Sequence, residues 1–360
     1  MTLPPPPTVQ THPAQFLTGR TLGDGWTVLP GTPASAAGGH GGHHSVGYFV
    51  QHKDGRAGFL KAVDVSGAYS APDVMEELQR MTSQYLFEVH LLKQCQDMRL
   101  SRVVHAIAHG EERLPGVLLP VPYIIFDRAD GDLRDHLNAT TVDDVWLLQC
   151  LHHVTVGVQQ LHQARFAHND LKPANVLVFP DHGWKVGDLG TAVDAQGTSP
   201  HHEEAFPGTW EYAPPETLYY ARLGDVWLDR RRADLYMLGG LVTFLFTHRH
   251  FNAYLYDELA EQLRPLVFAG DFEGAFSDVL PHVLEAFERA MAVVAQDIRA
   301  RVPAELAGEL IACIRELCTP DPLRRGHPRN LGRANPTTVQ QYISLFNRLA
   351  FQARLLRRTA

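Results

Sequence analysis

The stretch FAHNDLKPANVLV, residues 166–178, places four chemically different side chains, a His, an Asp, a Lys and an Asn, in a short loop between apolar flanks. They are His168, Asp170, Lys172 and Asn175. Buried flanks hold the side chains of such a loop in place, as chemistry at a site requires. Asp170 can orient a hydroxyl and accept its proton, and Lys172 can neutralise charge on a phosphoryl group in the same space. Asn175 offers a neutral oxygen to a hard cation such as Mg²⁺.

A second carboxylate, Asp188, follows in WKVGDLG, which is expected to be a short strand ending in a turn. Gly187 and Gly190 flank it, and glycines let the backbone turn sharply beside a polyphosphate. Because Mg²⁺ prefers oxygen ligands, Asp188 and Asn175 together form a candidate metal site.

The run H-N-D-L-K-P-A-N, from His168 to Asn175, followed by D-L-G from Asp188, resembles the catalytic loop and metal-binding turn of eukaryotic-type (Hanks-type) Ser/Thr protein kinases. The resemblance implies that Asp170 is the catalytic base and Lys172 the lysine that stabilises the phosphate. It implies that Asn175 and Asp188 bind Mg²⁺, or Mn²⁺ in its place, and that His168 supports the loop. ATP is then the phosphoryl donor and a protein the substrate.

Three later segments resemble the same family in the same order. GTWEYAPPE has Thr209 at the position that places the substrate, and it ends at Glu216. DLYMLGG resembles the helix whose aspartate, here Asp234, braces the catalytic loop. DPLRRGHP has Arg325 where the family keeps an arginine that pairs with the residue matching Glu216.

The residues expected to bind the nucleotide lie upstream. FLKAVD has Lys61 on a predicted strand, where the family keeps its ATP-anchoring lysine, and Glu88 on the following helix is its expected ion-pair partner. YIIFDRADGDL resembles the hinge of the family. Phe126 would be the gatekeeper, and the backbone of Asp127 and Ala129 would meet adenine.

The Gly-rich phosphate loop departs most from the family pattern. Counting back from Lys61 makes Gly39, Gly41, Gly42 and Val46 its members, with His44 where the third glycine is expected. A shifted alignment uses Gly42 and Gly47 instead. The nearby His40, His43 and His44 have two interpretations, a metal site and a flexible loop with polar side chains. No HExxH or Cys/His spacing supports the metal site.

Asn169 stands where many regulated kinases have an arginine that receives an activating phosphate. We therefore hypothesise that phosphorylation of the following segment, at Thr191, Thr198 or Ser199, is not required for activity.

The expected fold is α+β, a bilobal kinase-like arrangement with a small β-rich lobe and a larger helical lobe. The strand pattern around an Asp54-Gly55 turn predicts a hairpin, and apolar spacing predicts helices over 71–98 and 143–162. The predicted parts are a Pro-rich disordered tail (1–18), an N-lobe (19–128) and a C-lobe (129–360), with extra helices at about 249–305 and a C-terminal helix at 336–358.

Composition limits the partners and the cellular compartment expected for the protein. The 360 residues are 45% hydrophobic and 20% charged with a net charge of −8, so no general basic field favours nucleic acid. The four cysteines lack CxxC spacing and are expected to be buried thiols. We expect no signal peptide or membrane span, and a cytoplasmic location. The alanine- and arginine-rich, lysine-poor composition favours a high-GC bacterial source.

Two other functions stay open. A small-molecule kinase of the aminoglycoside or choline type also has H-x-D followed by asparagine, although Lys172 and GTWEYAPPE argue against it. A pseudokinase scaffold would keep the fold and lose the transfer, and the irregular Gly-rich loop keeps that possibility. The protein substrate and the oligomeric state are not indicated by the sequence.

Overall fold

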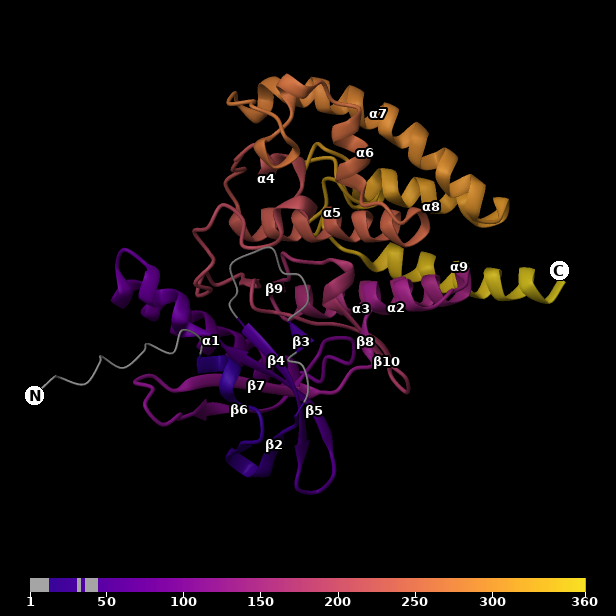
Figure 1. The fold of residues 1–360 in the computed structure, drawn as a ribbon. Coiled ribbons are helices and arrows are strands. Elements are labelled where there is room, and N and C mark those ends of the chain that lie inside the picture. The colour runs from indigo at the N-terminus through magenta and orange to yellow at the C-terminus, as the bar shows by residue number, and fades with distance from the viewer. Residues whose placement is uncertain (1–12, 31–33, 36–44, 360) are drawn as a thin grey trace, which may run out of the picture. The chain divides into compact units, whose positions relative to one another are not determined.

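The structure is a computed structural model whose ribbon is shown in Figure 1. It describes residues 13–30, 34–35 and 45–359. The chain divides into two compact units. Unit 1 comprises the residues up to Gln96 together with His105–Arg128, and unit 2 comprises Asp97–Val104 together with Ala129 to the C-terminus. Unit 1 is built on an antiparallel sheet and unit 2 is mostly helical, so the predicted bilobal α+β class is confirmed.

In the described part of unit 1, seven strands form one sheet in the order β1-β2-β4-β5-β7-β6, with β3 paired to β4. Their bounds are β1 Thr21–Leu22, β2 Trp26–Val28, β3 Ala34–Ser35, β4 Ser45–His52, β5 Ala57–Val63, β6 Ala106–Glu112 and β7 Val121–Asp127. The predicted hairpin is present as β4 and β5, with Gly55 in its turn at a φ of 92°. That left-handed conformation is one that glycine adopts without strain.

The two faces of this sheet carry different side chains. Leu60 on β5 pairs with Ile125 on β7, and both lie in an apolar core cluster with Trp26 and Val50. Because side chains alternate along a strand, Lys61 and its partner Ile124 belong to the opposite face. The sheet therefore places Lys61 on the face turned away from that cluster.

One helix completes unit 1. Helix α1, Val74–Asp97, is close to the predicted span of 71–98. Its Tyr85 hydroxyl donates to the carbonyl oxygens of Gly110 on β6 and Tyr123 on β7, at 3.1 and 3.3 Å. These bonds tie the helix to the sheet.

The predicted disordered tail is too long. Residues 1–12 lie outside the described part, but Pro13–Phe16 form the 3₁₀ helix η1. Ala14 and Leu17 are buried in the apolar cluster, and the Tyr48 hydroxyl donates to the carbonyl oxygen of Ala14 at 2.6 Å. The tail prediction followed the proline run and overlooked the apolar residues after it.

Unit 2 consists of helices with three short strand pairs. Its α-helices are α2 Leu133–Ala139, α3 Asp144–Gln163, α4 Pro215–Leu218, α5 Val226–Thr247, α6 Phe251–Asp257, α7 Phe276–Arg301, α8 Ala304–Leu317 and α9 Gln340–Thr359. Its strands are β8 Gly131–Asp132, β9 Phe166–Ala167, β10 Val176–Phe179, β11 Gly183–Val186 and β12 Val193–Asp194. Strand β10 pairs with β8 and β11, and β9 pairs with β12.

Two long helices form the framework of unit 2. Helix α3 begins after Asp143, whose side chain accepts the Trp146 N–H, and its buried face includes Leu148, Leu151 and Val158. Helix α9 packs along α3 (Figure 1) and begins four residues later than predicted, at Gln340. Within residues 13–30, 34–35 and 45–359, none of the helices combines the length and apolar content needed to cross a bilayer.

Candidate active site

The catalytic-loop candidate runs from β9 to the 3₁₀ helix η4, Pro173–Asn175, and it is held from below by Asp234 of α5. Asp234 is fully buried and accepts the backbone N–H of His168 at 2.9 Å and that of Asn169 at 2.8 Å. His162 of α3 lies 2.8 Å from the same carboxylate. Because Asn169 is held at a left-handed φ of 62°, these bonds fix a turn that would otherwise be unfavourable.

His162 is a supporting residue that the sequence argument missed. Burial lowers the pKa of its imidazole, while the hydrogen bond to Asp234 acts in the opposite direction. The neutral ring then donates through Nε2 to Asp234, so the buried carboxylate is stabilised without a second buried charge. Its position in the LHQ segment before the loop was the signal available in the sequence.

His168 connects the loop to the metal-binding turn. Its Nδ1 accepts the Asp170 N–H at 3.1 Å, which leaves Nε2 to donate to the Gly187 carbonyl oxygen at 2.9 Å. The Gly187 N–H in turn donates to the Asn175 carbonyl oxygen at 2.8 Å. Gly187 is thus anchored on both sides, and this fixes the start of the turn that carries Asp188.

The Asp170 carboxylate lies at the centre of a polar cluster. Its Oδ2 is 2.9 Å from Lys172 Nζ and 2.9 Å from Asn175 Nδ2, and its Oδ1 accepts the Thr209 N–H at 2.8 Å. Lys172 Nζ also donates to the Thr209 hydroxyl at 2.6 Å. The structure therefore brings together four of the predicted site residues, Asp170, Lys172, Asn175 and Thr209.

The donor set of Asn175 and Asp188 fits a hard cation. The side-chain nitrogen of Asn175 donates to the backbone carbonyl oxygen and the carboxylate of Asp170. The side-chain oxygen Oδ1 of Asn175 therefore remains for a cation. Asp188 is exposed at a left-handed φ of 55°. In the described ranges no cluster of three or more His, Cys, Asp or Glu side chains is arranged to hold a metal. Mg²⁺ suits such a sparse site because it keeps waters and shares substrate phosphates as ligands.

In unit 1, Lys61 and Glu88 meet as expected from the resemblance. Lys61 Nζ of β5 lies 3.0 and 3.2 Å from the two carboxylate oxygens of Glu88 on α1. The Glu88 side chain is buried. The two-oxygen contact holds the ammonium group in one position on its face of the sheet.

Val46 is placed differently from the expectation. It pairs with Ala62 of β5 and packs against the core cluster, on the face opposite to Lys61. Gly47 pairs directly with Lys61, so the shifted alignment, which used Gly47, agrees better with the register. The strand alternation moves every side chain to the other face when the register changes by one residue, and a count along the sequence could not resolve that difference. Gly39, Gly41 and Gly42 lie outside the described residues.

Aromatic side chains share the Lys61 face. Phe59 of β5 pairs with the predicted gatekeeper Phe126 of β7 and with Phe49 of β4. The Phe49 and Phe59 rings are 6.4 Å apart, edge to face. Phe59 was missed, although its position two residues before Lys61 implied the same face. Asp127 ends β7, and Ala129 follows two residues later.

The segment after the D-L-G turn is held by its own side chains, which the sequence argument did not assign. Asp194 accepts the backbone N–H groups of Thr198 and Ser199, at 2.9 and 2.7 Å, and the Thr198 hydroxyl at 2.8 Å. The buried Ser199 hydroxyl donates to the Ala192 carbonyl oxygen, and Thr191 donates to that of His168. Of Thr191, Thr198 and Ser199, whose phosphorylation we hypothesise is not required, only Thr198 is exposed.

Two further side chains, His201 and Arg230, continue this anchoring. The buried His201 ring contacts the Gly190 carbonyl oxygen through Nε2 and the Glu204 carboxylate through Nδ1, each at 2.8 Å. Arg230 of α5 donates to the carbonyl oxygens of Glu204 and Ala205. These contacts hold the segment from Gly190 to Ala205 at both ends without a phosphate group.

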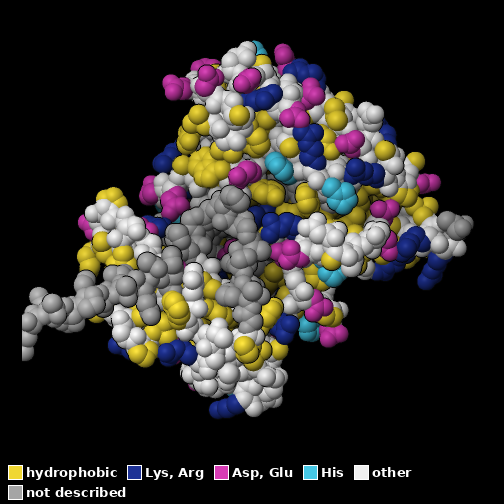
Figure 2. All heavy atoms as spheres, viewed as in Figure 1, with side chains coloured by type: hydrophobic (Ala, Val, Ile, Leu, Met, Phe, Trp, Pro, Cys, Tyr) yellow, Lys and Arg dark blue, Asp and Glu magenta, His cyan; other side chains and the backbone are white. Residues whose placement is uncertain are grey.

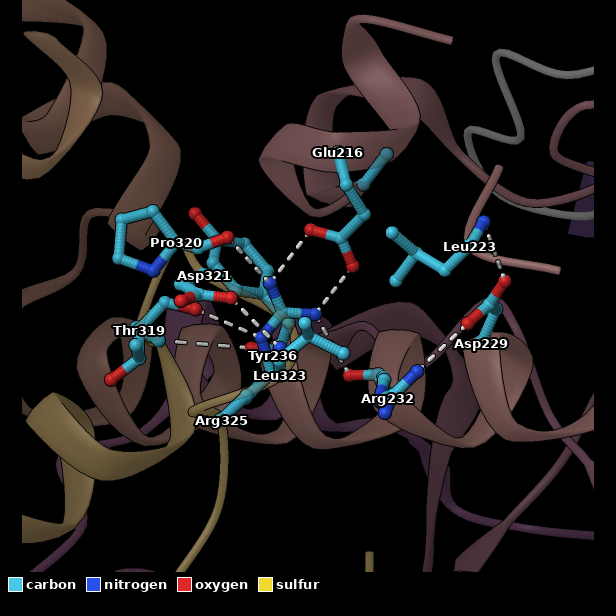
Figure 3. A network of polar contacts seen from close by, with 12 residues as sticks. Glu216, Leu223, Asp229, Arg232, Tyr236, Thr319, Pro320, Asp321, Leu323 and Arg325 are labelled. Atoms are coloured by element: carbon cyan, nitrogen blue, oxygen red, sulfur yellow. Dashed lines mark hydrogen bonds and ion pairs between the residues drawn. The ribbon is translucent and has the colours of Figure 1, made fainter. Parts of the chain in front are cut away.

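Glu216 and Arg325 form a buried ion pair (Figure 3). Arg325 Nη1 and Nη2 lie 2.6 and 2.7 Å from the two Glu216 oxygens. Burial alone would lower the pKa of Arg325, but the adjacent carboxylate raises it. The pair connects the segment that follows Thr209 to the chain beyond α8.

The sequence model of the protein kinase domain matches residues 39–325 of this chain, which is most of its length. The chain belongs to the protein kinase family. The match begins in the Gly-rich stretch and ends at Arg325 of the buried ion pair, so this kinase domain includes all the site residues named above.

Curated relatives agree with this assignment. A calmodulin-binding receptor-like cytoplasmic kinase 2 of Arabidopsis thaliana is 27% identical over 220 residues, which cover 59% of this chain and 48% of the relative. An interferon-induced, double-stranded RNA-activated protein kinase of Mus musculus is 29% identical over 136 residues, covering 37% of this chain and 24% of the relative. The chain spans less than half the length of these kinases.

Proposed function

We propose that the chain is a Ser/Thr protein kinase that transfers the γ-phosphoryl group of ATP to hydroxyls of proteins, including its own. One observation carries this proposal: Lys172 Nζ lies 2.9 Å from Asp170 and 2.6 Å from the Thr209 hydroxyl. The lysine connects the proposed base to the segment that places a peptide. A kinase that acts on small molecules has no use for such a connection.

Each side chain of this cluster has a role that follows from its chemistry. Asp170 orients the acceptor hydroxyl and takes its proton as the oxygen attacks. Lys172 neutralises negative charge on the phosphoryl group during transfer. The Thr209 N–H donates to one oxygen of the Asp170 carboxylate. This bond fixes the orientation of the carboxylate, and therefore the position of its other oxygen.

Asn175 and Asp188 would hold Mg²⁺, with Mn²⁺ as a substitute. A bound divalent cation supplies charge neutralisation at the phosphates and orients them for in-line transfer. The contribution of the chain is to present two oxygen donors, one from Asn175 at the end of η4 and one from Asp188 on the turn that His168 fastens through Gly187. ATP and Mg²⁺ are the cofactors implied by this donor set.

We assign nucleotide binding in unit 1 to the Lys61 face of the sheet. The Lys61 ammonium, positioned by Glu88, would contact the α- and β-phosphates. Phe59 and Phe126 would lie beside the base, because they stand two residues from Lys61 and Ile124 on the same face. Asp127 and Ala129 would bond the base through their backbone.

We further propose that the kinase works in the cytoplasm of a bacterium. The four cysteines are free and buried, which suits a reducing compartment. The protein substrate and the number of chains in the working enzyme are left open by this proposal.

The test is the intact mass of the purified chain after incubation with Mg²⁺ and ATP, beside Asp188→Ala. We expect mass gains in steps of one phosphate in the wild type and none in the variant. The same reaction with a generic Ser/Thr protein such as casein extends the test to substrates in trans. ATP binding without any transfer would support the scaffold alternative, and absence of both would reject the proposal.

A further inference from the structure

A groove of about 320 Å³ lies where the beginning of α3 meets the end of α9, within unit 2. On the α3 side it is lined by Asp143, Trp146 and Gln149. On the α9 side it is lined by Arg354, Arg357 and Arg358. We call these six residues the α9 groove. Its volume is at the lower end of the range for ligand pockets, about 300–1,000 Å³, so it has room for one or two side chains of a partner.

The Trp146 ring gives the α9 groove a fixed apolar wall. His136 of α2 stacks on this ring with centroids 5.4 Å apart, and the Trp184 ring of β11 meets it edge to face at 4.7 Å. The Asp143 side chain accepts the Trp146 N–H at 2.7 Å and so fixes the start of the helix. Trp146 is nevertheless only partly buried. A ring that is already held in place loses little conformational entropy when a partner covers it.

The arginines of the groove differ in their partners. Arg357 pairs with Asp143 across the groove. Arg354 and Arg358 are exposed, and in the described part of the chain no carboxylate pairs with either of them. Figure 2 shows Lys and Arg side chains gathered at the end of α9. The chain as a whole has a net charge of −8, so the groove is a local positive site that is complementary to carboxylates.

An exposed face of α9 continues the groove. Phe351 is 61% exposed and Leu355 is 46% exposed. Residues Phe351, Arg354, Leu355 and Arg358 stand at positions i, i+3, i+4 and i+7, and side chains at this spacing are neighbours on one face of a helix. Because Arg354 and Arg358 also line the groove, the apolar pair and the groove form one surface. Arginine in the last turn of a helix is favoured by the helix dipole, but that effect does not explain the exposed Phe351 and Leu355.

The polar groups of the groove suit a polypeptide. A guanidinium group can bind a carboxylate through two parallel hydrogen bonds. The Gln149 side chain is partly exposed and forms no hydrogen bond among the described residues, so its amide is available to donate to and accept from a peptide backbone. A flat membrane surface does not enter a groove between two helices, whereas an extended segment does.

We propose that the α9 groove binds an acidic segment of a partner protein, in which Glu or Asp residues are interspersed with large apolar side chains. The carboxylates pair with Arg354 and Arg358. The apolar side chains cover Trp146 and the adjacent Phe351 and Leu355, and burial of this area strengthens binding. The groove shares no residue with the cluster around Asp170, so this partner site does not depend on the proposed transfer of phosphate.

The experiment measures the binding of fluorescein-labelled peptides to the full chain by fluorescence anisotropy. The pool contains short peptides with Glu and with Leu or Phe in every order, each beside a counterpart with Gln in place of Glu. We expect the best acidic peptides to bind at least about tenfold more tightly than their counterparts. Their binding should weaken as salt is added, because exposed charge pairs are screened.

Two double variants test the two parts of the surface. In Arg354→Gln/Arg358→Gln the dissociation constant of the best acidic peptide should rise roughly tenfold, and most of its salt dependence should disappear. In Phe351→Ser/Leu355→Ser the dissociation constant should also rise roughly tenfold, while the salt dependence remains.

The matched control is Arg299→Gln/Arg333→Gln, which removes the same charge at two exposed positions outside the groove. It should leave the dissociation constant within about twofold of the wild type. Thermal unfolding of each variant shows whether the fold is retained. The proposal is overturned if no acidic peptide binds better than its Gln counterpart, or if the control loses as much affinity as Arg354→Gln/Arg358→Gln.

Sedimentation with vesicles of phosphatidylcholine and phosphatidylserine tests the other occupant. Vesicle binding that is lost in Arg354→Gln/Arg358→Gln, without any binding of the acidic peptides, would assign the surface to an anionic membrane and overturn the proposal. Peptide binding without vesicle binding supports it. The kinase function is measured separately, by phosphate incorporation, so its failure would not be confused with failure of the groove.

Discussion

The Asp170 carboxylate is held in position by polar contacts with three neighbouring groups. Lys172, Asn175 and the Thr209 N–H all lie within 2.9 Å of its carboxylate. An asparagine at this position keeps the size of the side chain but cannot accept the substrate proton. We expect Asp170→Asn to lower kcat roughly 10²–10⁴-fold with little change in the KM for ATP.

The measurement is steady-state phosphorylation of a peptide, with the exposed Asp181→Asn on the β10–β11 turn as the matched control. Loss of less than tenfold in Asp170→Asn would contradict the role of Asp170 as the base. An equal loss in the control would point to a general effect on the fold.

Gly208 shows how closely the backbone packs behind this cluster. A Cβ atom there would overlap the carbonyl oxygen of Asn169 and approach the Phe206 ring. Because backbone atoms cannot move aside as side chains do, we expect Gly208→Ala to lower the free energy of unfolding by roughly 1–3 kcal/mol. Gly308→Ala on α8, where nothing lies within 4 Å, should instead raise it by about 0.5–1 kcal/mol. Urea unfolding of both variants tests this contrast.

At the scale of elements, the segment from Gly190 to Ala205 is ordered by hydrogen bonds that need no phosphate. Asp194 accepts from Thr198 and from the Ser199 N–H, and His201 contacts Gly190 and Glu204. We expect Thr198→Ala to reduce activity less than about threefold, because it removes one hydrogen bond at an exposed position. Asp194→Ala removes the acceptor of two backbone N–H groups, one of which, that of Ser199, is buried, and it should reduce activity more than about tenfold.

Activity after phosphatase treatment is the direct measurement, with limited proteolysis of each variant to report order in the segment. A wild type that becomes inactive when dephosphorylated would contradict this account and would restore a requirement for a phosphate. Faster cleavage in Asp194→Ala than in Thr198→Ala is expected.

The contact between α3 and β11 gives the protein a pH dependence. His153 of α3 lies against Trp184, with ring centroids 5.3 Å apart, and burial together with Arg102 and His152 lowers its pKa from 6.5 to about 4. The folded state thus binds a proton less readily than the unfolded state. The contribution of the buried, neutral His153 ring to stability is therefore complete above pH 6.5 and is lost as the pH falls from 6.5 to 4.

Urea unfolding at pH 7.5 and pH 5 tests this sign. We expect the free energy of unfolding to fall less between the two values in His153→Gln than in the wild type. His282→Gln, at an exposed position on α7, should leave the wild-type difference unchanged. A steeper fall in His153→Gln would contradict the assignment.

At the scale of the whole molecule, unit 2 depends on an ion pair between distant parts of the chain. Arg325 is fully buried and pairs with Glu216 through two hydrogen bonds. Removing one partner leaves a buried charge unpaired, so we expect Glu216→Gln to cost roughly 3–5 kcal/mol of unfolding free energy. Glu309→Gln, which breaks the exposed pair with Arg348, should cost about 0–1 kcal/mol.

Chemical unfolding monitored by far-UV circular dichroism compares these two variants. Similar losses of unfolding free energy in the two variants would mean that burying the ion pair of Arg325 does not increase its contribution to stability. The wild type and Glu309→Gln should unfold at nearly the same urea concentration.

Much of the fold was predictable because its signals are local. The Asp54-Gly55 turn fixes the β4–β5 hairpin, and the apolar stripe after Asp143 fixes α3. That the polar side chains of the 166–178 loop lie together was predictable for the same reason, since four chemically distinct side chains stand at short spacings. Strand register was not, because counting back from Lys61 left two alignments of the Gly-rich loop open, and one residue of shift exchanges the two faces of a strand.

The anchoring of the segment after Asp188 could not be predicted because it depends on distant partners. Arg230 reaches the carbonyl oxygens of Glu204 and Ala205 from α5, and nothing in the spacing of these residues indicates the contact. The segment between α6 and α7 could not be predicted either, because its path depends on contacts with the distant Tyr219 and with Tyr256.

The reactivity of the four buried cysteines reports on local opening of the structure around them. Burial raises the pKa of Cys95 on α1 to about 12, and it also raises the pKa of Cys150, Cys313 and Cys318. Since only an exposed thiolate reacts quickly with an alkylating reagent, each sulfur is modified at the rate at which its surroundings open. Cys95 reports on unit 1 and the other three on unit 2. Peptide mapping after brief alkylation would therefore time the opening of the two units separately, without any label being introduced.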